Sequence, residues 1–119
     1  NVLLVDDEDL ARQNIRMMLQ GDSEIASVSE CANGFEAVEF LHATATDIVF
    51  LDIQMPKMNG IEFLKQARAK YPTLPIFVMT GHSPFTKAEV LGFGANGYFE
   101  KTPLDFIHFL GKKFGTLSA

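Results

Sequence analysis

The chain has 119 residues, a formal net charge of -5 and 47% hydrophobic residues. These values are typical of one globular domain and exclude a disordered chain. An acidic domain of this kind is not expected to bind nucleic acid directly. The single cysteine, Cys31, cannot form an internal disulfide, so we expect a reducing, cytoplasmic location. No apolar run approaches the roughly 18 residues of a membrane-spanning helix, which predicts no membrane association.

Five short apolar segments predict strands. In chain order they are residues 2–5, 26–29, 48–51, 76–79 and 97–99. The first, third and fourth are almost continuously hydrophobic, as in parallel strands that are covered on both faces. The second alternates and the fifth is short, so we expect these two near the edges of the sheet. Because the chain begins inside a predicted strand without an initiator Met, we expect one domain over residues 1–119, with a core at about 1–115, from a longer protein.

Amphipathic helices are predicted between the strands and after the last one. Their apolar faces consist of Ala11, Ile15, Met18 and Leu19 in the first, Ile61, Leu64, Ala67 and Tyr71 in the third, and Leu104, Ile107, Leu110 and Phe114 in the fifth. Helix N-termini are predicted at Asn33 and Asn59, each three residues before a Glu, and at Ser83-Pro84 and Thr102-Pro103. Alternating strands and helices predict a parallel sheet whose functional residues collect at the carboxyl ends of the strands.

Polar side chains stand where four of the five predicted strands end. Asp6 and Asp7 follow the first strand, Asp52 follows the third, Thr80 follows the fourth, and Lys101 comes just after the fifth. Taken singly, an Asp after a strand is as readily the cap of the next helix, and a lone Thr or Lys is usually structural or solvated. Their combination at one edge of the sheet favours a shared site.

Three clustered carboxylates repel one another unless a cation joins them. Mg²⁺ suits a site with few carboxylates and room for water and phosphate, and Mn²⁺ would be a substitute. The metal and Lys101 would together neutralise an incoming phosphoryl group. Asp52 ends the strand that we expect at the centre of the sheet, and a carboxylate there can act as the nucleophile and form an aspartyl phosphate. The stretch from Met55-Pro56 to Gly60 then turns the chain sharply away.

Four motifs carry a resemblance to a known family. The stretches "LLVDDE", "DIVFLDIQMPKMNGIEFL", "PIFVMTG" and "GANGYFEK" have the order and spacing of the receiver domain of two-component response regulators. The resemblance covers nearly the whole chain. It implies an α/β, flavodoxin-like, doubly wound (βα)5 sandwich, with a five-stranded parallel sheet in the strand order 2-1-3-4-5.

The resemblance also implies roles for particular residues. It makes Asp52 the phosphoacceptor and Asp6 and Asp7 the acid pair at the metal. The Mg²⁺ ligands would be Asp7, Asp52 and the backbone carbonyl of Gln54. Thr80 would be the switch hydroxyl, Lys101 the phosphate-binding lysine and Tyr98 the switching aromatic. The implied reaction moves a phosphoryl group from the phosphohistidine of a sensor histidine kinase or phosphotransfer protein to Asp52, and hydrolysis follows. The added charge of about -2 would switch the domain and so control an output or partner. Such a signalling domain catalyses its own modification but is not counted as an enzyme.

Two polar residues beside the predicted acceptor and switch are candidates for tuning. Gln54 and His82 lie two residues beyond Asp52 and Thr80, where their side chains would border the attacking water. We therefore expect them to set the lifetime of the phosphorylated state.

The last part of the chain departs from the family pattern. Thr102 stands before Pro103, although the family usually places proline directly after the lysine, so the place of any cis peptide stays open. Phe106 and Phe109 fall outside the apolar face of the last predicted helix and near Tyr98. They would give a surface from the fourth to the fifth helix for dimerisation or output contact, although scattered exposed apolar residues are equally ordinary.

Two other functions are compatible with an acidic site in such a sheet. The main alternative is a Mg²⁺-dependent phosphatase with an aspartyl nucleophile. Such an enzyme usually needs a second acid soon after the nucleophile, but position 54 is Gln, and no Asp or Glu lies between Asp52 and Glu62. A flavodoxin-like FMN carrier needs a phosphate-binding loop after the first strand, where the acidic residues 6–9 would repel phosphate without a metal.

Overall fold

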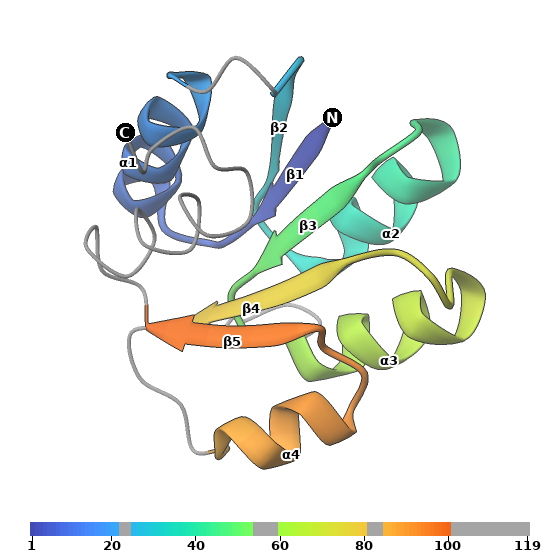
Figure 1. Ribbon diagram of the computed structural model, residues 1–119. Helices are drawn as coiled ribbons and strands as arrows, with labels where there is room; N and C mark the ends of the chain where they lie inside the picture. The colour runs from blue at the N-terminus through green and yellow to red at the C-terminus, as the bar shows by residue number, and fades with distance from the viewer. Residues whose placement is uncertain (22–24, 54–59, 81–84, 101–119) are drawn as a thin grey trace.

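The computed structural model describes residues 1–21, 25–53, 60–80 and 85–100, which form alternating strands and helices (Figure 1). In chain order these elements are β1 (Val2–Val5), α1 (Asp9–Gln20), β2 (Val28–Cys31), α2 (Gly34–Ala43), β3 (Ile48–Leu51), α3 (Gly60–Lys70), β4 (Ile76–Thr80), α4 (Lys87–Gly92) and β5 (Gly97–Glu100). The fifth predicted helix and its Thr102-Pro103 start lie outside the described residues, as does the predicted cap at Asn59.

The five strands form one parallel sheet in the order β2-β1-β3-β4-β5. The predicted doubly wound, flavodoxin-like architecture is therefore confirmed. The continuously apolar β3 lies at the centre of the sheet, and the two weaker strands, β2 and β5, lie at its edges.

The second strand spans Val28–Cys31 and not residues 26–29 as predicted. Its extent follows from pairing with β1, in which Val28 lies opposite Val2 and Cys31 opposite Val5. The alternation in residues 26–29 does not contain this information, because the register depends on a strand more than twenty residues away. The fourth and fifth strands each run one residue further than predicted, since Thr80 pairs with Glu100.

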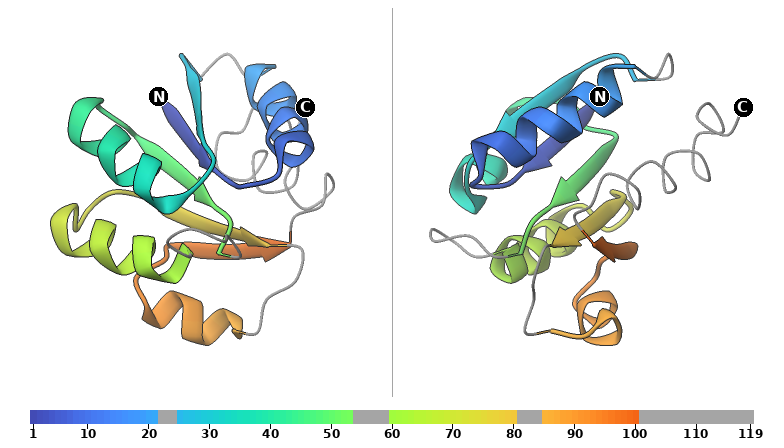
Figure 2. Two further views of the ribbon diagram at one scale, coloured as in Figure 1. Left: turned by 180° about the vertical axis from the view of Figure 1, so that it is seen from behind. Right: turned by 90° about the vertical axis from the view of Figure 1, so that its left-hand side faces the viewer.

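Helices cover both faces of the sheet, with α1 on one side and α2, α3 and α4 on the other (Figures 1 and 2). Successive strand residues point to opposite faces, so Val2 and Leu4 pack with Ile15 and Leu19 of α1. The alternate strand residues pack with the other helices in a second core cluster. Two apolar layers explain why the central strands are hydrophobic at every position, and they hold the strand ends firmly in place.

Local capping fixes where two of the helices begin. Asn33 caps α2 as predicted, because its Oδ1 accepts a hydrogen bond from the Glu36 N–H at 2.9 Å. The predicted start of the fourth helix at Ser83-Pro84 is wrong, since α4 begins at Lys87. There Thr86 and Glu89 form a reciprocal capping box, with hydrogen bonds of 3.1 and 3.0 Å. This Thr-x-x-Glu pattern was visible in the sequence and satisfies two N–H groups at the helix start.

Cys31 lies at the end of β2 and is buried, with 5% of its surface exposed. Burial raises the pKa of its thiol from the usual 9.0 to about 11, with Glu36 adding to the rise and Arg12 opposing it. Near pH 8 the reactive thiolate is therefore about a hundredfold scarcer than in an ordinary cysteine. We expect iodoacetamide to alkylate the folded protein at least about a hundredfold more slowly than the urea-unfolded chain, as followed by mass spectrometry. Equal rates would contradict the assignment of Cys31 to the core.

Candidate functional site

The buried polar side chains of the described residues gather at the side of the sheet formed by the carboxyl ends of its strands. They belong to Asp6, Asp52 and Thr80, which are 0%, 3% and 2% exposed. Asp6 follows β1, Asp52 follows β3, and Thr80 is the last residue of β4. Burying a carboxylate or hydroxyl is costly, and this cost falls only at the carboxyl ends of three neighbouring strands in the described part of the chain. Such a concentration favours a functional site over separate structural roles.

Backbone pairing of the strands brings the first and third predicted strand ends together. Val5 and Leu51 are partners in the pairing of β1 with β3, and the Asp52 N–H donates to the Val5 carbonyl oxygen at 2.8 Å. On the other side, the Asp6 N–H donates to the Cys31 carbonyl oxygen at 3.1 Å. The backbone N–H of each acid is therefore hydrogen-bonded to a neighbouring strand, which fixes the position of its Cα atom.

Four acids meet at this edge. Asp6, Asp7, Glu8 and Asp52 each offer one carboxylate oxygen, and these oxygens all lie within 4.8 Å of one another. Asp7 and Glu8 are exposed, so the cluster is buried on one side and open to solvent on the other. So many oxygens at such distances repel one another, and a divalent cation that prefers oxygen ligands relieves the repulsion. The residues present therefore fit a metal site.

The clustering predicted for Asp6, Asp7 and Asp52 is found in the structure, but Glu8 was not among the predicted site residues. Glu8 is the N-cap residue of α1, and its N–H donates to Asp6 Oδ1 at 2.9 Å. The signal available in the sequence was its place directly after the acid pair. Glu8 at the start of α1 can reach the end of β1 only if the loop between the two elements is short. The sequence pattern alone does not give the length of that loop.

Pairing of β4 with β5 places two further predicted residues, Thr80 and Tyr98. Thr80 lies opposite Glu100 and Val78 opposite Tyr98. Tyr98 is half-buried and packs against the core on the α2–α4 side. Lys101 follows Glu100 in the sequence but lies outside the described residues, as do Gln54 and His82. The described part of the site thus consists of the acidic cluster just after β1 and β3 and the hydroxyl of Thr80.

Gly60 allows the chain to return to the sheet immediately behind Asp52. Its N–H donates to the Ile53 carbonyl oxygen at 3.2 Å. A Cβ atom at Gly60 would lie 2.3 Å from the Ile53 Cα and 2.6 Å from the Asp52 carbonyl oxygen. Since backbone atoms cannot move aside cheaply, only glycine fits at this close approach. The packing of Gly60 against Asp52 and Ile53 therefore depends on the absence of a side chain. Met55 and Pro56 of the predicted turn lie outside the described residues.

Replacing Gly60 with Ala should lower the free energy of unfolding by about 1–3 kcal/mol, because the methyl group must displace packed backbone. Urea denaturation monitored by circular dichroism measures this change. Gly92 is the matched control, since a Cβ there would meet no atom within 4 Å. Gly92 ends α4, so Gly92→Ala should be neutral or slightly stabilising. Equal destabilisation by the two substitutions would contradict the close approach at Gly60.

A family model described as the response regulator receiver domain matches residues 2–108. The chain belongs to this family. Receiver domains are signalling domains of two-component systems, and family membership implies interaction with histidine kinases or phosphotransfer proteins. It does not favour the phosphatase alternative. The acidic loop after β1 likewise gives no support to an FMN carrier, since its Asp6, Asp7 and Glu8 form the acidic cluster together with Asp52.

The curated relatives are response regulators and transcriptional regulatory proteins. The receiver domain is 36% identical to the response regulator UvrY of Escherichia coli O157:H7 over 102 residues, or 85% of this chain and 47% of UvrY. It is 52% identical to the transcriptional regulatory protein BtsR of Salmonella typhimurium over 63 residues, or 53% of this chain and 26% of BtsR. The chain thus spans about half or less of the length of these relatives.

Solved structures extend the likeness to nearly the whole fold. The Vibrio cholerae chemotaxis protein CheY4 shares 32% identity with a TM-score of 0.80, covering 93% of this receiver domain and 92% of CheY4. TrrA of Thermotoga maritima, in a complex with Mg²⁺ and BeF, shares 28% identity with a TM-score of 0.82, covering 98% and 96% of the two chains. None of the helices in the described ranges has the length and apolar character needed to cross a membrane.

Proposed function

We propose that Asp52 accepts a phosphoryl group from the phosphohistidine of a sensor histidine kinase or phosphotransfer protein. The observation that carries the proposal is the position of this carboxylate. It is 3% exposed at the end of the central strand, and one of its oxygens belongs to the acidic cluster. A carboxylate held in this way is preorganised as a nucleophile. Transfer breaks the donor's phosphorus–nitrogen bond and forms an acyl phosphate on Asp52.

The acidic cluster would hold Mg²⁺, with Mn²⁺ as a substitute. Asp7 and Asp52 would be direct ligands beside Asp6, and the Gln54 carbonyl would be a third. When bound, the ion neutralises charge on the phosphoryl oxygens and on the carboxylates. The complex of TrrA with Mg²⁺ and BeF, at 28% identity over nearly the whole chain, supports the same use of the cluster here.

Thr80 and Tyr98 would carry the switch, and Lys101 would bind the phosphoryl group. Thr80 ends β4, next to the strand that carries Asp52, so its hydroxyl is on the same edge. When this hydroxyl turns toward the phosphoryl oxygens, Tyr98 would move into the space it leaves. Lys101, directly after β5, would supply a positive charge to the same group.

The domain would also remove the phosphoryl group by hydrolysis: water attacks the phosphorus, the bond to the Asp52 oxygen breaks, and inorganic phosphate leaves. It would thus catalyse both its phosphorylation and its dephosphorylation without being an enzyme in the usual sense. Gln54 and His82 would tune this step. If replacing both with Ala leaves the hydrolysis rate of the phosphorylated domain unchanged, the tuning role is wrong.

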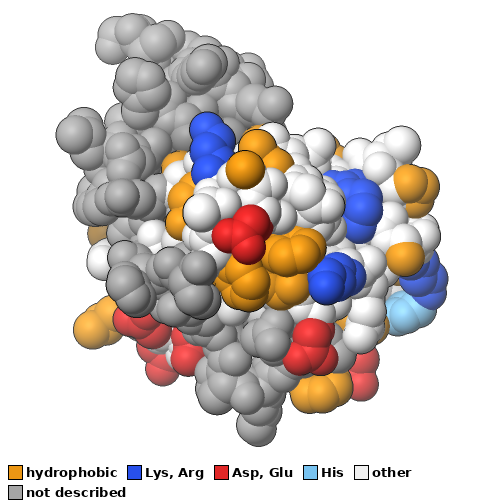
Figure 3. Space-filling view, turned by 90° about the horizontal axis from the view of Figure 1, so that it is seen from below, with side chains coloured by type: hydrophobic (Ala, Val, Ile, Leu, Met, Phe, Trp, Pro, Cys, Tyr) orange, Lys and Arg blue, Asp and Glu red, His pale blue; other side chains and the backbone are white. Residues whose placement is uncertain are grey.

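An output or dimer surface would include α4 and the last predicted helix. Figure 3 shows hydrophobic side chains gathered among acidic and basic ones on the side of the molecule where α4 lies. On α4, Leu91 is 38% exposed. Lys65 of α3 has its Nζ 4.8 Å from the ring centroid of Phe93, the C-cap residue of α4. The contributions of Phe106 and Phe109 stay predictions, as do a single domain over residues 1–119, a cytoplasmic location and the absence of direct nucleic-acid binding.

Labelling with acetyl phosphate tests the proposed function. The receiver domain is incubated with acetyl phosphate and Mg²⁺, and its intact mass is measured. We expect a gain equal to one phosphoryl group, which is lost on treatment with hydroxylamine because acyl phosphates are labile to it. Excess EDTA should prevent the gain. A mass gain that persists in EDTA, or that peptide mapping places away from Asp52, would overturn the proposal.

A further inference from the structure

Arg12 of α1 joins three groups beside the acidic cluster. Its side chain is 13% exposed, and its guanidinium donates to the backbone carbonyl oxygen of Asp6 and to the carboxylate of Asp9. Its Nε also donates to Glu30 Oε1 on β2 at 3.1 Å. A guanidinium presents its donors in a fixed planar fork, so three partners hold it in one orientation.

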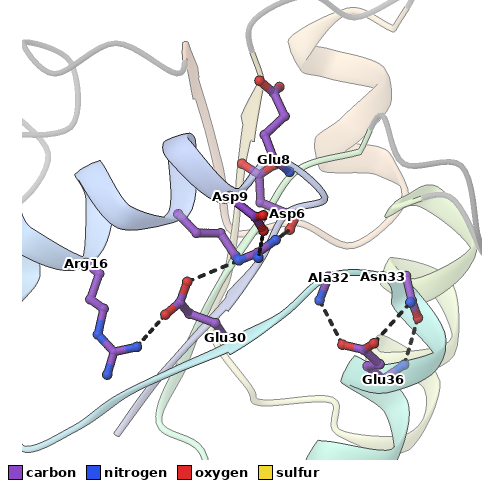
Figure 4. Close-up of polar contacts among 9 residues, drawn as sticks. Asp6, Glu8, Asp9, Arg16, Glu30, Ala32, Asn33 and Glu36 are labelled. Atoms are coloured by element: carbon purple, nitrogen blue, oxygen red, sulfur yellow. Dashed lines mark hydrogen bonds and ion pairs between the residues drawn. The ribbon is translucent and has the colours of Figure 1, made fainter.

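Glu30 anchors this arrangement to the sheet. Its second carboxylate oxygen accepts a hydrogen bond from Arg16, one turn further along α1, and Figure 4 shows Glu30 bonded by guanidinium groups on both sides. The two arginines and the acids Asp9 and Glu30 carry opposite and equal formal charges. The network therefore fixes the loop between β1 and α1 without adding net charge beside the cluster.

The Asp6 carbonyl belongs to the peptide unit that joins Asp6 to Asp7. Because a peptide unit is planar, holding this oxygen also fixes the position of the Asp7 Cα. The peptide unit after Asp7 is held as well, since the Glu8 N–H donates to Asp6 Oδ1 at 2.9 Å. Asp7 itself is exposed, so its backbone is held on both sides while its carboxylate faces solvent.

We propose that Arg12 is a positioning residue that sets the direction of the Asp7 carboxylate toward the metal. This inference rests on the proposed metal-dependent function of the cluster. Arg12 touches no reacting atom and acts only through the backbone of the loop. Groups that orient metal ligands typically change metal affinity by tenfold or more when they are removed.

A pair of arginine variants tests the role of Arg12. Arg12→Met keeps the length of the side chain and removes its bond to the Asp6 carbonyl. Arg16→Met removes the same charge and a bond to the same Glu30, but leaves the Asp6 carbonyl bond in place. Two readouts are taken: the Mg²⁺ dissociation constant by calorimetry, and the hydrogen-exchange rate of the Glu8 amide in metal-free protein by NMR.

We expect Arg12→Met to weaken Mg²⁺ binding about tenfold and to speed exchange at Glu8 about tenfold through local opening of the loop. Arg16→Met should change both quantities less than about twofold. Unchanged binding in Arg12→Met, or equal losses in both variants, would overturn the proposal. If Arg12→Met does not fold, Glu30→Leu replaces it, since leucine has no acceptor oxygen to hold the Arg12 guanidinium at β2, and it should weaken binding about threefold.

The two proposals fail in different ways. If wild-type protein binds no Mg²⁺, the proposed function fails. The hydrogen-exchange rate of the Glu8 amide is then the remaining test of whether Arg12 holds the loop. An exchange rate in metal-free Arg12→Met equal to that of wild type would show that Arg12 does not hold the loop.

Discussion

The Asp52→Asn protein should gain no phosphoryl group from acetyl phosphate, a loss of at least about a thousandfold in labelling rate. An amide nitrogen or oxygen is a poor nucleophile beside a carboxylate and cannot form the acyl phosphate. The expected effect is this large because the nearby acids Asp6 and Asp7 belong to the same cluster but would bind the ion and are not placed at the end of the central strand. Intact-mass spectrometry over a time course measures the rate.

Two controls separate chemistry from folding. Glu39→Gln makes the same charge change at an exposed position of α2 and should label like wild type. Circular dichroism should show an intact Asp52→Asn fold, since the substitution only removes a buried charge. If Asp52→Asn labels at the wild-type rate while Glu39→Gln does too, the acceptor is another residue.

Mg²⁺ should raise the free energy of unfolding of the wild-type domain by about 2.7 kcal/mol when its concentration is a hundred times its dissociation constant. The gain arises because the folded chain gathers four carboxylate oxygens within 4.8 Å, while the unfolded chain does not. Urea denaturation with and without Mg²⁺, at ionic strength matched with NaCl, measures it. Excess EDTA should return the stability to its starting value.

Asp7→Asn tests whether the stabilisation comes from the cluster. It should remove most of the Mg²⁺ effect and, at the same time, stabilise the metal-free protein slightly, because one repelling charge is lost. Glu39→Gln should keep the full response to Mg²⁺. An equal response in all three proteins would mean that the ion acts generally on an acidic chain and not at this site.

Some features of the fold follow from residues close together in the sequence, and these were predicted correctly. The buried central strands show as continuous apolar segments, and the Asn33 cap depends only on Glu36 three residues away. The same kind of local signal explains the true start of α4, where Thr86 and Glu89 outweigh the Ser-Pro pattern before them.

Other features depend on contacts between distant parts of the chain. The limits of β2 follow from its register with β1, which a single strand's pattern does not contain. The acid cluster could be predicted because the carboxyl ends of parallel strands must share an edge. The hydrogen bond from Arg12 to the Asp6 carbonyl oxygen could not be predicted. Every residue has a backbone carbonyl, so no residue type in the sequence marks this acceptor.

The cluster divides into a fixed half and an accessible half. Asp6 and Asp52 are buried, while Asp7 and Glu8 are exposed to water. An ion there would enter and leave without opening the interior, so its residence time would be short and its occupancy would track the free concentration in the surroundings. The buried carboxylate of Asp52, by contrast, would keep its position while ions bind and leave.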